Sequence, residues 1–203
     1  MTSRTDLRRR MRRQRRALTP SQRIEAAWQM ADHLAASALF RNSRRIAAYL
    51  PADGEMDPEP LMERAWELGK TVYLPVLVPF GHNRLWFAPY RPGDRLMSNC
   101  YGIDEPRIVH RGRISATALD LVLAPLVAFD ASGNRLGMGG GYYDRSFGFL
   151  QRRRHWQKPR LVGLAYDFQR VRALPAQSWD VPLTAVATDV GLYPDAAPRG
   201  VRR

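Results

Sequence analysis

The chain has 203 residues, of which 45% are hydrophobic, enough for one globular domain with a substantial core; this composition excludes wholesale disorder. A single cysteine, Cys100, excludes an internal disulfide and a cysteine-based metal cluster, so we expect it to serve in packing within a reducing compartment. No apolar stretch approaches the roughly 20 residues that span a bilayer, and the N-terminus lacks the apolar core of a secretion signal. These features predict a cytoplasmic protein without a membrane partner.

The net charge of +13 is concentrated at the N-terminus, where residues 1–16 contain eight arginines and one aspartate. About half of the net charge therefore lies in this arm. Such an arm could bind nucleic acid through its phosphates, a contact that weakens with salt. Its composition also matches that of some transit peptides. The structural alternative is a solvated, arginine-rich helix, and the composition does not decide among the three.

The first predicted elements are helices. Thr19-Pro20-Ser21-Gln22 combines a cap, a proline in the first turn and a glutamine three residues after the cap, which predicts a helix start. The apolar residues that follow fall on one face, so this helix should pack on a core: Ile24, Ala27, Trp28, Ala31, Leu34 and Ala35. A second helix is expected from Asp57-Pro58 until Gly69, and another over residues 142–154.

Short apolar runs between these helices predict strands over residues 46–50, 71–77, 85–88, 120–124, 160–165 and 184–187. Strands that alternate with helices favour an α/β domain: one central, mostly parallel sheet with helices on both faces, a Rossmann-like three-layer arrangement. We expect this single domain to cover residues 1–193, with a helical arm over 1–18 and a flexible tail over 194–203. Ligands of such sheets collect beyond the carboxyl ends of the strands.

The most informative motif follows the predicted strand 120–124, in the segment Arg135-Leu136-Gly137-Met138-Gly139-Gly140-Gly141-Tyr142-Tyr143-Asp144-Arg145. Dense glycines leave backbone N–H groups free to approach a ligand, and successive N–H groups suit a phosphate. Arg135 can add a fork of donors to a phosphate or a carboxylate. Asp144 is placed to hold a metal that bridges to such a phosphate.

A glycine cluster alone is more often a flexible turn than a ligand site. This one is not the phosphate loop of ATPases, because no Gly-Lys-Ser/Thr follows it. It also departs from the dinucleotide fingerprint, because Tyr142 stands where the third glycine would be. The preceding arginine and strand, and the aromatic and acidic residues that follow, favour a binding role.

The glycine motif, with the preceding Pro125-x-x-Ala128-Phe129-Asp130-x-x-Gly133, resembles the signature of the 5-formyltetrahydrofolate cyclo-ligases, also called 5,10-methenyltetrahydrofolate synthetases. Shorter matches in the family's order cover nearly the whole chain: Leu7-Arg8, Tyr49-Leu50, Glu55-x-Asp57, Gly102-Ile103-x-Glu105-Pro106, Pro175, Asp180 and Thr188. The resemblance implies an enzyme, expected as a monomer, that uses ATP as co-substrate and Mg²⁺. It would convert 5-formyltetrahydrofolate to 5,10-methenyltetrahydrofolate and release ADP and phosphate.

The resemblance also implies which residues bind. For ATP these are Arg4, Arg8, Arg135, Leu136, Gly137, Met138, Gly139, Gly140, Gly141, Tyr142 and Tyr143. For the folate they are Leu50, Glu55, Met138, Gly139, Gly140, Gly141 and Tyr142, with the Glu55 carboxylate accepting from the donor-rich edge of the pterin. Asp144 and Asp180 would hold Mg²⁺, because two carboxylates facing phosphates repel them unless a cation lies between.

Three positions depart from the family's pattern. Position 4 is usually lysine, position 138 is often basic but here is Met138, and Leu126 stands where glycine is common. The loss of a basic residue at 138 leaves more of the phosphate charge to Arg135 or the arm. The implied mechanism is phosphorylation of the formyl oxygen followed by ring closure at N10, in which the protein positions the reactants and stabilises charge.

Other functions stay open from the residues alone. A nucleic-acid-binding protein would use the basic arm, although the chain has no aromatic-basic RNA motif and no zinc-ligand spacing. A phosphosugar or acyl-CoA enzyme could use a related α/β sheet. The four histidines show no ligand spacing and no triad order, so structural roles are expected for His33, His82, His110 and His155.

Overall fold

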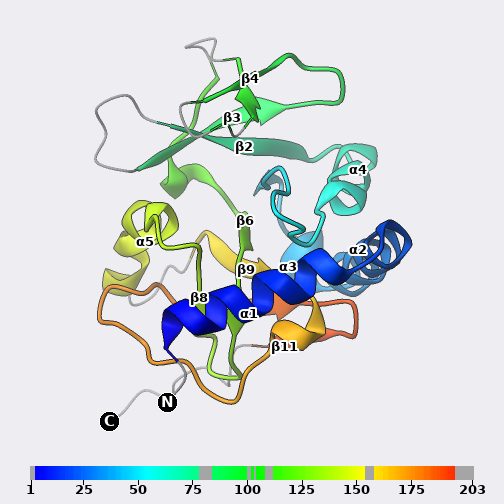
Figure 1. Ribbon diagram of the computed structural model, residues 1–203. Helices are drawn as coiled ribbons and strands as arrows, with labels where there is room; N and C mark the ends of the chain where they lie inside the picture. Colours follow the sequence, from blue (N-terminus) through cyan, green and yellow to red (C-terminus); the bar gives the residue numbers. More distant parts are fainter. Residues whose placement is uncertain are drawn as a thin grey trace.

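The structure is a computed structural model that describes residues 3–77, 84–99, 102, 104–107, 112–153 and 158–194. Within these residues, seven strands form the central sheet in the order β11-β10-β9-β6-β1-β2-β3 (Figure 1). Their bounds are β1 Arg45–Ala47, β2 Thr71–Leu77, β3 Leu85–Tyr90, β6 Leu121–Pro125, β9 Arg160–Leu164, β10 Ala185–Ala187 and β11 Leu192–Pro194.

The middle of the sheet is parallel, and both of its edges are antiparallel. β10, β9, β6, β1 and β2 run in one direction, whereas β3 pairs antiparallel with β2 and β11 pairs antiparallel with β10. After β1 the chain continues to β2 on one side, and it later returns to β6 on the other side of β1. The boundary between β1 and β6 is therefore the switch point of the sheet, where α/β folds open a crevice at the strands' carboxyl ends.

Helices and 3₁₀ turns cover both faces, which confirms the predicted α/β architecture (Figure 1). The helices are α1 Arg4–Ala17, α2 Pro20–Ala35, α3 Ala38–Arg41, α4 Glu59–Glu67 and α5 Tyr142–Phe147, and the 3₁₀ turns are η1 Ala116–Ala118, η2 Gly148–Arg152 and η3 Asp167–Gln169. The predicted capping box at the start of α2 is present, with Thr19 and Gln22 bonded reciprocally. The helix expected over 142–154 is shorter, because at Gly148 it passes into a 3₁₀ turn that ends at Arg152.

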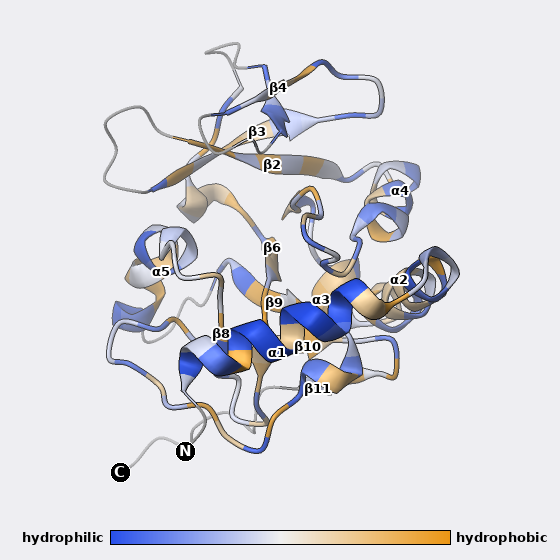
Figure 2. Ribbon diagram, viewed as in Figure 1, coloured by the Kyte–Doolittle hydropathy of each residue, from blue (hydrophilic) through white to orange (hydrophobic). Residues whose placement is uncertain are grey.

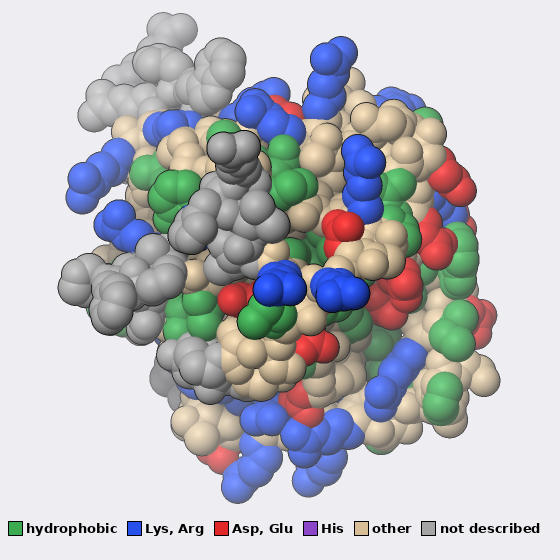
Figure 3. Space-filling view, turned by 90° about the horizontal axis from the view of Figure 1, so that it is seen from above, with side chains coloured by type: hydrophobic (Ala, Val, Ile, Leu, Met, Phe, Trp, Pro, Cys, Tyr) green, Lys and Arg blue, Asp and Glu red, His purple; other side chains and the backbone are tan. Residues whose placement is uncertain are grey.

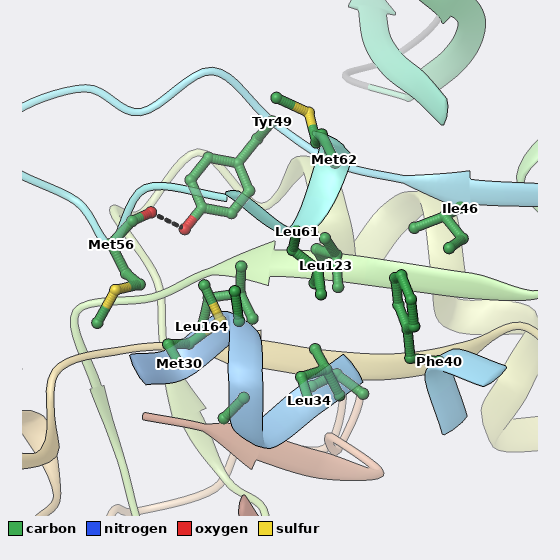
Figure 4. Close-up of a cluster of buried hydrophobic side chains, with 14 of the residues drawn as sticks. Met30, Leu34, Phe40, Ile46, Tyr49, Met56, Leu61, Met62, Leu123 and Leu164 are labelled. Carbon is green, nitrogen blue, oxygen red and sulfur yellow. Dashed lines mark hydrogen bonds between the residues drawn. The ribbon is translucent and has the colours of Figure 1, made fainter. Parts of the chain in front are cut away.

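Alternation along the strands divides the core between the two faces. Ile46, Leu121 and Leu123 point to the face covered by α2, α3 and α4, whereas Ala47 and Val122 point to the face covered by α5, η1 and η2. Figure 4 shows the first cluster, in which Met30 and Leu34 of α2 pack beneath the strands and Tyr49 donates a hydrogen bond to the Met56 carbonyl. Orange segments run through the strands of the sheet in Figure 2.

Two small antiparallel pairs, which the sequence patterns did not indicate, flank the sheet. β4 (Leu96–Ser98) pairs with β5 (Asp104–Pro106), and β7 (Ala128–Phe129) pairs with β8 (Arg135–Leu136). The second pair follows β6 directly and ends where the glycine motif begins, so it sets the position of that motif. Across the part of the chain that the structure describes, none of the helices has the length and apolar character needed to cross a bilayer.

The N-terminal arm is a packed helix and not a solvated one. Leu7 and Met11 of α1 are buried in a third apolar cluster with Ala128 of β7, Leu136 of β8, Val127, and Leu174 from the segment after η3. In Figure 1, α1 lies across β8, although the two elements are far apart in the sequence. Pro194, which was expected to open the tail, is instead the last residue of β11. Residues 195–203, Cys100, His82, His110 and His155 lie outside the described residues.

Candidate functional site

A cavity of about 910 Å³ opens at the switch point of the sheet. Its walls come from the segment after β1, which contributes Tyr49, Leu50 and Glu55, and from Pro125 at the end of β6. Because β1 and β6 are parallel neighbours, their carboxyl ends meet at the same edge. The cavity therefore lies where this topology is expected to bind ligands.

The glycine loop, residues 137–141, forms one wall of the cavity. Gly139 and Gly141 have φ angles of 111° and 66°, which side chains disfavour. A Cβ atom at Gly141 would also lie 2.9 Å from the Arg145 guanidinium, which donates a hydrogen bond to the Gly140 carbonyl. The loop therefore depends on glycine for its path as well as for exposing its N–H groups.

Two arginines of α1 reach the cavity from the beginning of the chain, and one of them contacts the glycine loop. Nε of Arg8 donates a 2.9 Å hydrogen bond to the Gly137 carbonyl, and Arg4 forms a 3.4 Å ion pair with Asp180. Both arginines line the cavity. Partial burial, together with the positive charge of Arg4, lowers the pKa of Arg8. An anion bound between the two guanidinium groups would relieve this repulsion.

Arg135 is buried and paired with an acidic residue of the same motif. Its guanidinium donates to the Asp144 carboxylate at 2.5 Å and to the Val181 carbonyl, and its side chain is only 5% exposed. Asp144 accepts a second hydrogen bond from the Val181 amide. Arg135, predicted to hold phosphate, and Asp144, predicted to hold a metal, are thus brought together and neutralise each other.

The second predicted metal ligand, Asp180, lies on the same side of the cavity, since its neighbour Val181 contacts both Arg135 and Asp144. Its carboxylate accepts from Arg4 and from the Gln177 amide. Within the described residues, no cluster of three or more carboxylate, histidine or cysteine ligands is found. Two carboxylates plus phosphate oxygens and waters are nevertheless a donor set that suits Mg²⁺.

Glu55 also lines the cavity, from the turn that follows β1. Burial raises the pKa of its carboxyl group, and the hydrogen bond from the Ala52 amide and the nearby Arg15 only partly offset this. Burial, with Glu55 adding to it, also raises the pKa of Tyr143. Glu55 is therefore a poorly solvated acceptor that faces the same space as the glycine segment, as required to bind a donor-rich heterocycle.

The structure gathers nearly all of the predicted site residues around this one cavity. It is lined by Arg4, Arg8, Leu50, Glu55, Arg135, Gly137, Met138, Gly139, Gly140, Gly141, Tyr142, Tyr143, Asp144 and Asp180. Leu136 is the exception and a correction to the predicted set. Its side chain is fully buried with Leu7 and Met11, because alternation along β8 turns it away from the neighbouring Arg135.

Several residues that line the cavity carried no sequence signal. An apolar wall comes from β2 and β3: Leu74, Pro75, Leu77 and Leu85. Trp179 stands at the rim with 63% of its surface exposed, next to Asp180. Asp53 also lines the cavity, and its position two residues before Glu55 could have suggested this. The arginines of α1 that bind it are too far away in the sequence to be predicted. Figure 3 shows Lys and Arg side chains scattered over one outer face, with acidic and hydrophobic ones between them.

Comparisons with known proteins agree with one another. A model of the 5-formyltetrahydrofolate cyclo-ligase family matches residues 1–189. The 5-formyltetrahydrofolate cyclo-ligase of Escherichia coli (strain K12) is 44% identical over 178 residues, which cover 88% of this chain and 96% of that protein. The one from Haemophilus influenzae is 40% identical over 182 residues, covering 89% and 94%. The solved structure of Aquifex aeolicus 5,10-methenyltetrahydrofolate synthetase superposes with a TM-score of 0.80 at 30% identity, covering 98% and 96%.

Proposed function

Because this chain belongs to the 5-formyltetrahydrofolate cyclo-ligase family, it is an enzyme that forms 5,10-methenyltetrahydrofolate from 5-formyltetrahydrofolate, and we propose that it does so with ATP as co-substrate and Mg²⁺, releasing ADP and phosphate. One observation carries the proposal. One cavity is lined by a phosphate-type wall, built from the glycine loop and two arginines, and also by apolar residues of β2 and β3 and the buried Glu55.

In the proposed reaction the formyl oxygen attacks the γ-phosphorus of ATP, so that an O–P bond forms and the bond from phosphorus to ADP breaks. The formyl carbon becomes an iminium carbon bearing a phosphate leaving group. N10 then attacks this carbon, its proton is lost, and the carbon–oxygen bond breaks to release phosphate. The ring that closes contains the methenyl bridge between N5 and N10.

The protein's contribution to these steps is to position the reactants and to stabilise charge. The amide groups of residues 137–141 and the guanidinium of Arg8 would hold the phosphate oxygens. Glu55 would accept hydrogen bonds from the pterin, and Leu50 with the apolar wall of β2 and β3 would enclose the rings and exclude water. Tyr142 and Tyr143 line the same cavity and would contact the bound substrates.

Asp144 and Asp180 are the residues that would hold Mg²⁺. When bound, the ion neutralises phosphate charge near two carboxylates that would otherwise repel it. Arg135, the partner of Asp144, would then be free to turn its donors toward a phosphate oxygen.

The test is to mix the protein with 5-formyltetrahydrofolate, ATP and Mg²⁺ and to follow the absorbance of the methenyl product. We expect product and phosphate to appear in equal amounts, and neither to appear when ATP or Mg²⁺ is omitted. Product formation without ATP, or none in the complete mixture, would contradict the proposal.

A further inference from the structure

Three arginines of α1 bind the side chain of Asp53. Its carboxylate accepts hydrogen bonds from Nε of Arg12 at 2.5 Å, from Nε of Arg16 at 2.5 Å and from Arg15 at 3.2 Å. Burial by itself would raise the pKa of Asp53, but the hydrogen bonds from Arg12 and Arg16 outweigh it and hold the pKa below its usual value. The carboxylate is therefore charged at neutral pH and bound to α1 in its charged form.

Arg15 makes this contact more than a surface ion pair. Its side chain is fully buried, and besides Asp53 it reaches the Leu126 carbonyl at 3.4 Å and the Glu55 carboxylate at 3.8 Å. The Nε atom of Arg15 has no hydrogen-bond partner within the described structure. Asp53 is thus the nearest anionic partner of a buried cation, which makes the position of the turn sensitive to the position of α1.

The turn that carries Asp53 and Glu55 is tightly fitted to the end of α1. Among the described residues, Asp53 is the one non-glycine residue with a positive φ angle, 51°. Gly54 follows with a φ of 70°, and a Cβ atom there would lie 3.3 Å from the Arg15 carbonyl oxygen. Since Glu55 comes next, the contact between Asp53 and α1 determines where the Glu55 carboxylate lies.

The same helix carries the arginines of the phosphate end. Arg4, Arg8 and Arg12 recur every four residues and so share one face of α1. A helix rises about 1.5 Å per residue, so Arg4 and Arg16 are separated by roughly 18 Å along the axis. One helix thus contacts Asp180 and the glycine loop through Arg4 and Arg8 in its first half, and the Glu55 turn through the arginines of its second half.

We propose that Asp53 is a positioning residue that couples the two halves of the cavity: a phosphate-bearing ligand held by Arg4 and Arg8 fixes α1, and α1 fixes the Glu55 turn through Asp53. Binding of the nucleotide then strengthens binding of the folate, and the reverse holds by the same factor. This inference rests on the proposed function, because it assigns the two ends of the cavity to ATP and to 5-formyltetrahydrofolate.

The experiment measures the coupling factor directly. The dissociation constant of 5-formyltetrahydrofolate is determined by calorimetry with and without a saturating, non-hydrolysable ATP analogue and Mg²⁺, for the parent and for Asp53→Asn. Asparagine keeps the size of the side chain and tolerates a positive φ, so the substitution removes the charge with little change to the turn. Because the coupling factor is a ratio, a direct loss of folate contacts cancels from it.

For the parent we expect the analogue to tighten folate binding by a factor within the range of roughly 5 to 150 that is typical of coupled sites. In Asp53→Asn this factor should fall close to one. Arg16→Gln removes one of the charged donors to Asp53 from an exposed side chain, so its coupling factor should lie between those of the parent and Asp53→Asn. This second variant keeps the test valid if Asp53→Asn does not fold. The matched control is Asp32→Asn, which removes a carboxylate bound to Arg64 on the outside of α2 and should leave the factor unchanged.

Three outcomes separate the possibilities. If the parent binds both ligands without coupling, the inference is wrong. If Asp53→Asn and Arg16→Gln lose affinity or stability but retain the parent's coupling factor, Asp53 has only a structural role and the inference is also wrong. If the parent binds neither ligand, it is the proposed function that fails.

Discussion

Arg8 and Gly137 join the beginning of the chain to the glycine loop: the Arg8 Nε atom lies 2.9 Å from the Gly137 carbonyl oxygen, 129 residues away. This bond uses the Nε donor and leaves the other donors of the guanidinium to other partners, and Arg8 lines the cavity. The same side chain thus holds the loop in place and offers donors to a phosphate.

Arg8→Ala should therefore weaken ATP binding far more than folate binding. The loss of a hydrogen bond to a charged group costs about 1.5–3 kcal/mol, which corresponds to a roughly ten- to hundredfold loss of affinity. The measurement is the KM for each substrate, or the dissociation constant of a non-hydrolysable ATP analogue.

Arg9→Ala is the matched control. Arg9 is adjacent on α1, but its side chain is 80% exposed and pairs with Asp6, so the ATP KM should not change. An unchanged ATP KM in Arg8→Ala, or in a protein that lacks residues 1–8, would show that the arm does not bind nucleotide.

Glu55→Gln should weaken binding of 5-formyltetrahydrofolate and leave ATP binding nearly intact, because an amide cannot accept from the pterin with both of its terminal atoms. Burial raises the pKa of Glu55, so this side chain becomes protonated at a higher pH than an ordinary glutamate. As the pH is lowered, the affinity of the parent for folate should therefore begin to fall at that higher pH. Calorimetry as a function of pH should show this fall in the parent and not in the variant.

The sign of the effect on stability is the opposite. A carboxyl group whose folded pKa is raised destabilises the fold while it is ionised, and this cost disappears as pH falls through the folded pKa toward the unfolded value. As the pH is lowered through that interval, the free energy of unfolding of the parent should therefore rise relative to that of Glu55→Gln. A constant difference between the two proteins would mean that the pKa of Glu55 is not raised.

Asp144→Asn and Asp180→Asn should both increase the Mg²⁺ concentration that turnover requires, but only the first should clearly reduce stability. Asp144 neutralises the buried Arg135, and loss of a hydrogen-bonded partner of a charged group costs about 1.5–3 kcal/mol. Asp180 pairs with the partly exposed Arg4, and an exposed pair of this kind contributes roughly 0–1 kcal/mol.

Titration of Mg²⁺ against turnover, together with melting curves, tests both statements. Asp32→Asn removes an ion pair between α2 and α4 and should leave the Mg²⁺ requirement unchanged. Normal Mg²⁺ dependence in both cavity variants would mean that ATP alone carries the metal, whatever happens to stability.

Gly141→Ala should destabilise the protein by about 1–2 kcal/mol or more, because it places a side chain at a φ of 66° and a Cβ atom against the Arg145 guanidinium. Gly137→Ala is the comparison within the same loop. A Cβ atom there would meet nothing within 4 Å, so its melting temperature should stay near that of the parent. Equal losses of stability in the two variants would contradict the geometry of the loop.

The sequence alone determined the elements whose signals are local. Thr19 and Gln22 bond to each other across three residues, so the start of α2 could be placed without knowing the rest of the fold. The apolar run 71–77 matched β2 residue for residue. The glycine loop was recognisable for the same reason, since a dense glycine run between an arginine and two tyrosines restricts what the segment can do.

Pairing across long stretches of chain was decided only by the tertiary structure. Nothing near Arg15 distinguishes it from the other arginines of the arm, yet it is fully buried because Asp53 and Leu126 supply its partners. The antiparallel edge strand β11 escaped prediction because its Leu-Tyr-Pro sequence has no apolar run, and only its pairing with β10 makes it a strand. Arg135 and Asp144 each suggested a ligand contact, but only the fold shows that they are bound to each other. Burial, charge neutralisation and strand order depend on neighbours that the chain brings together from a distance, and this is why local patterns could name most residues of the site but not their partners.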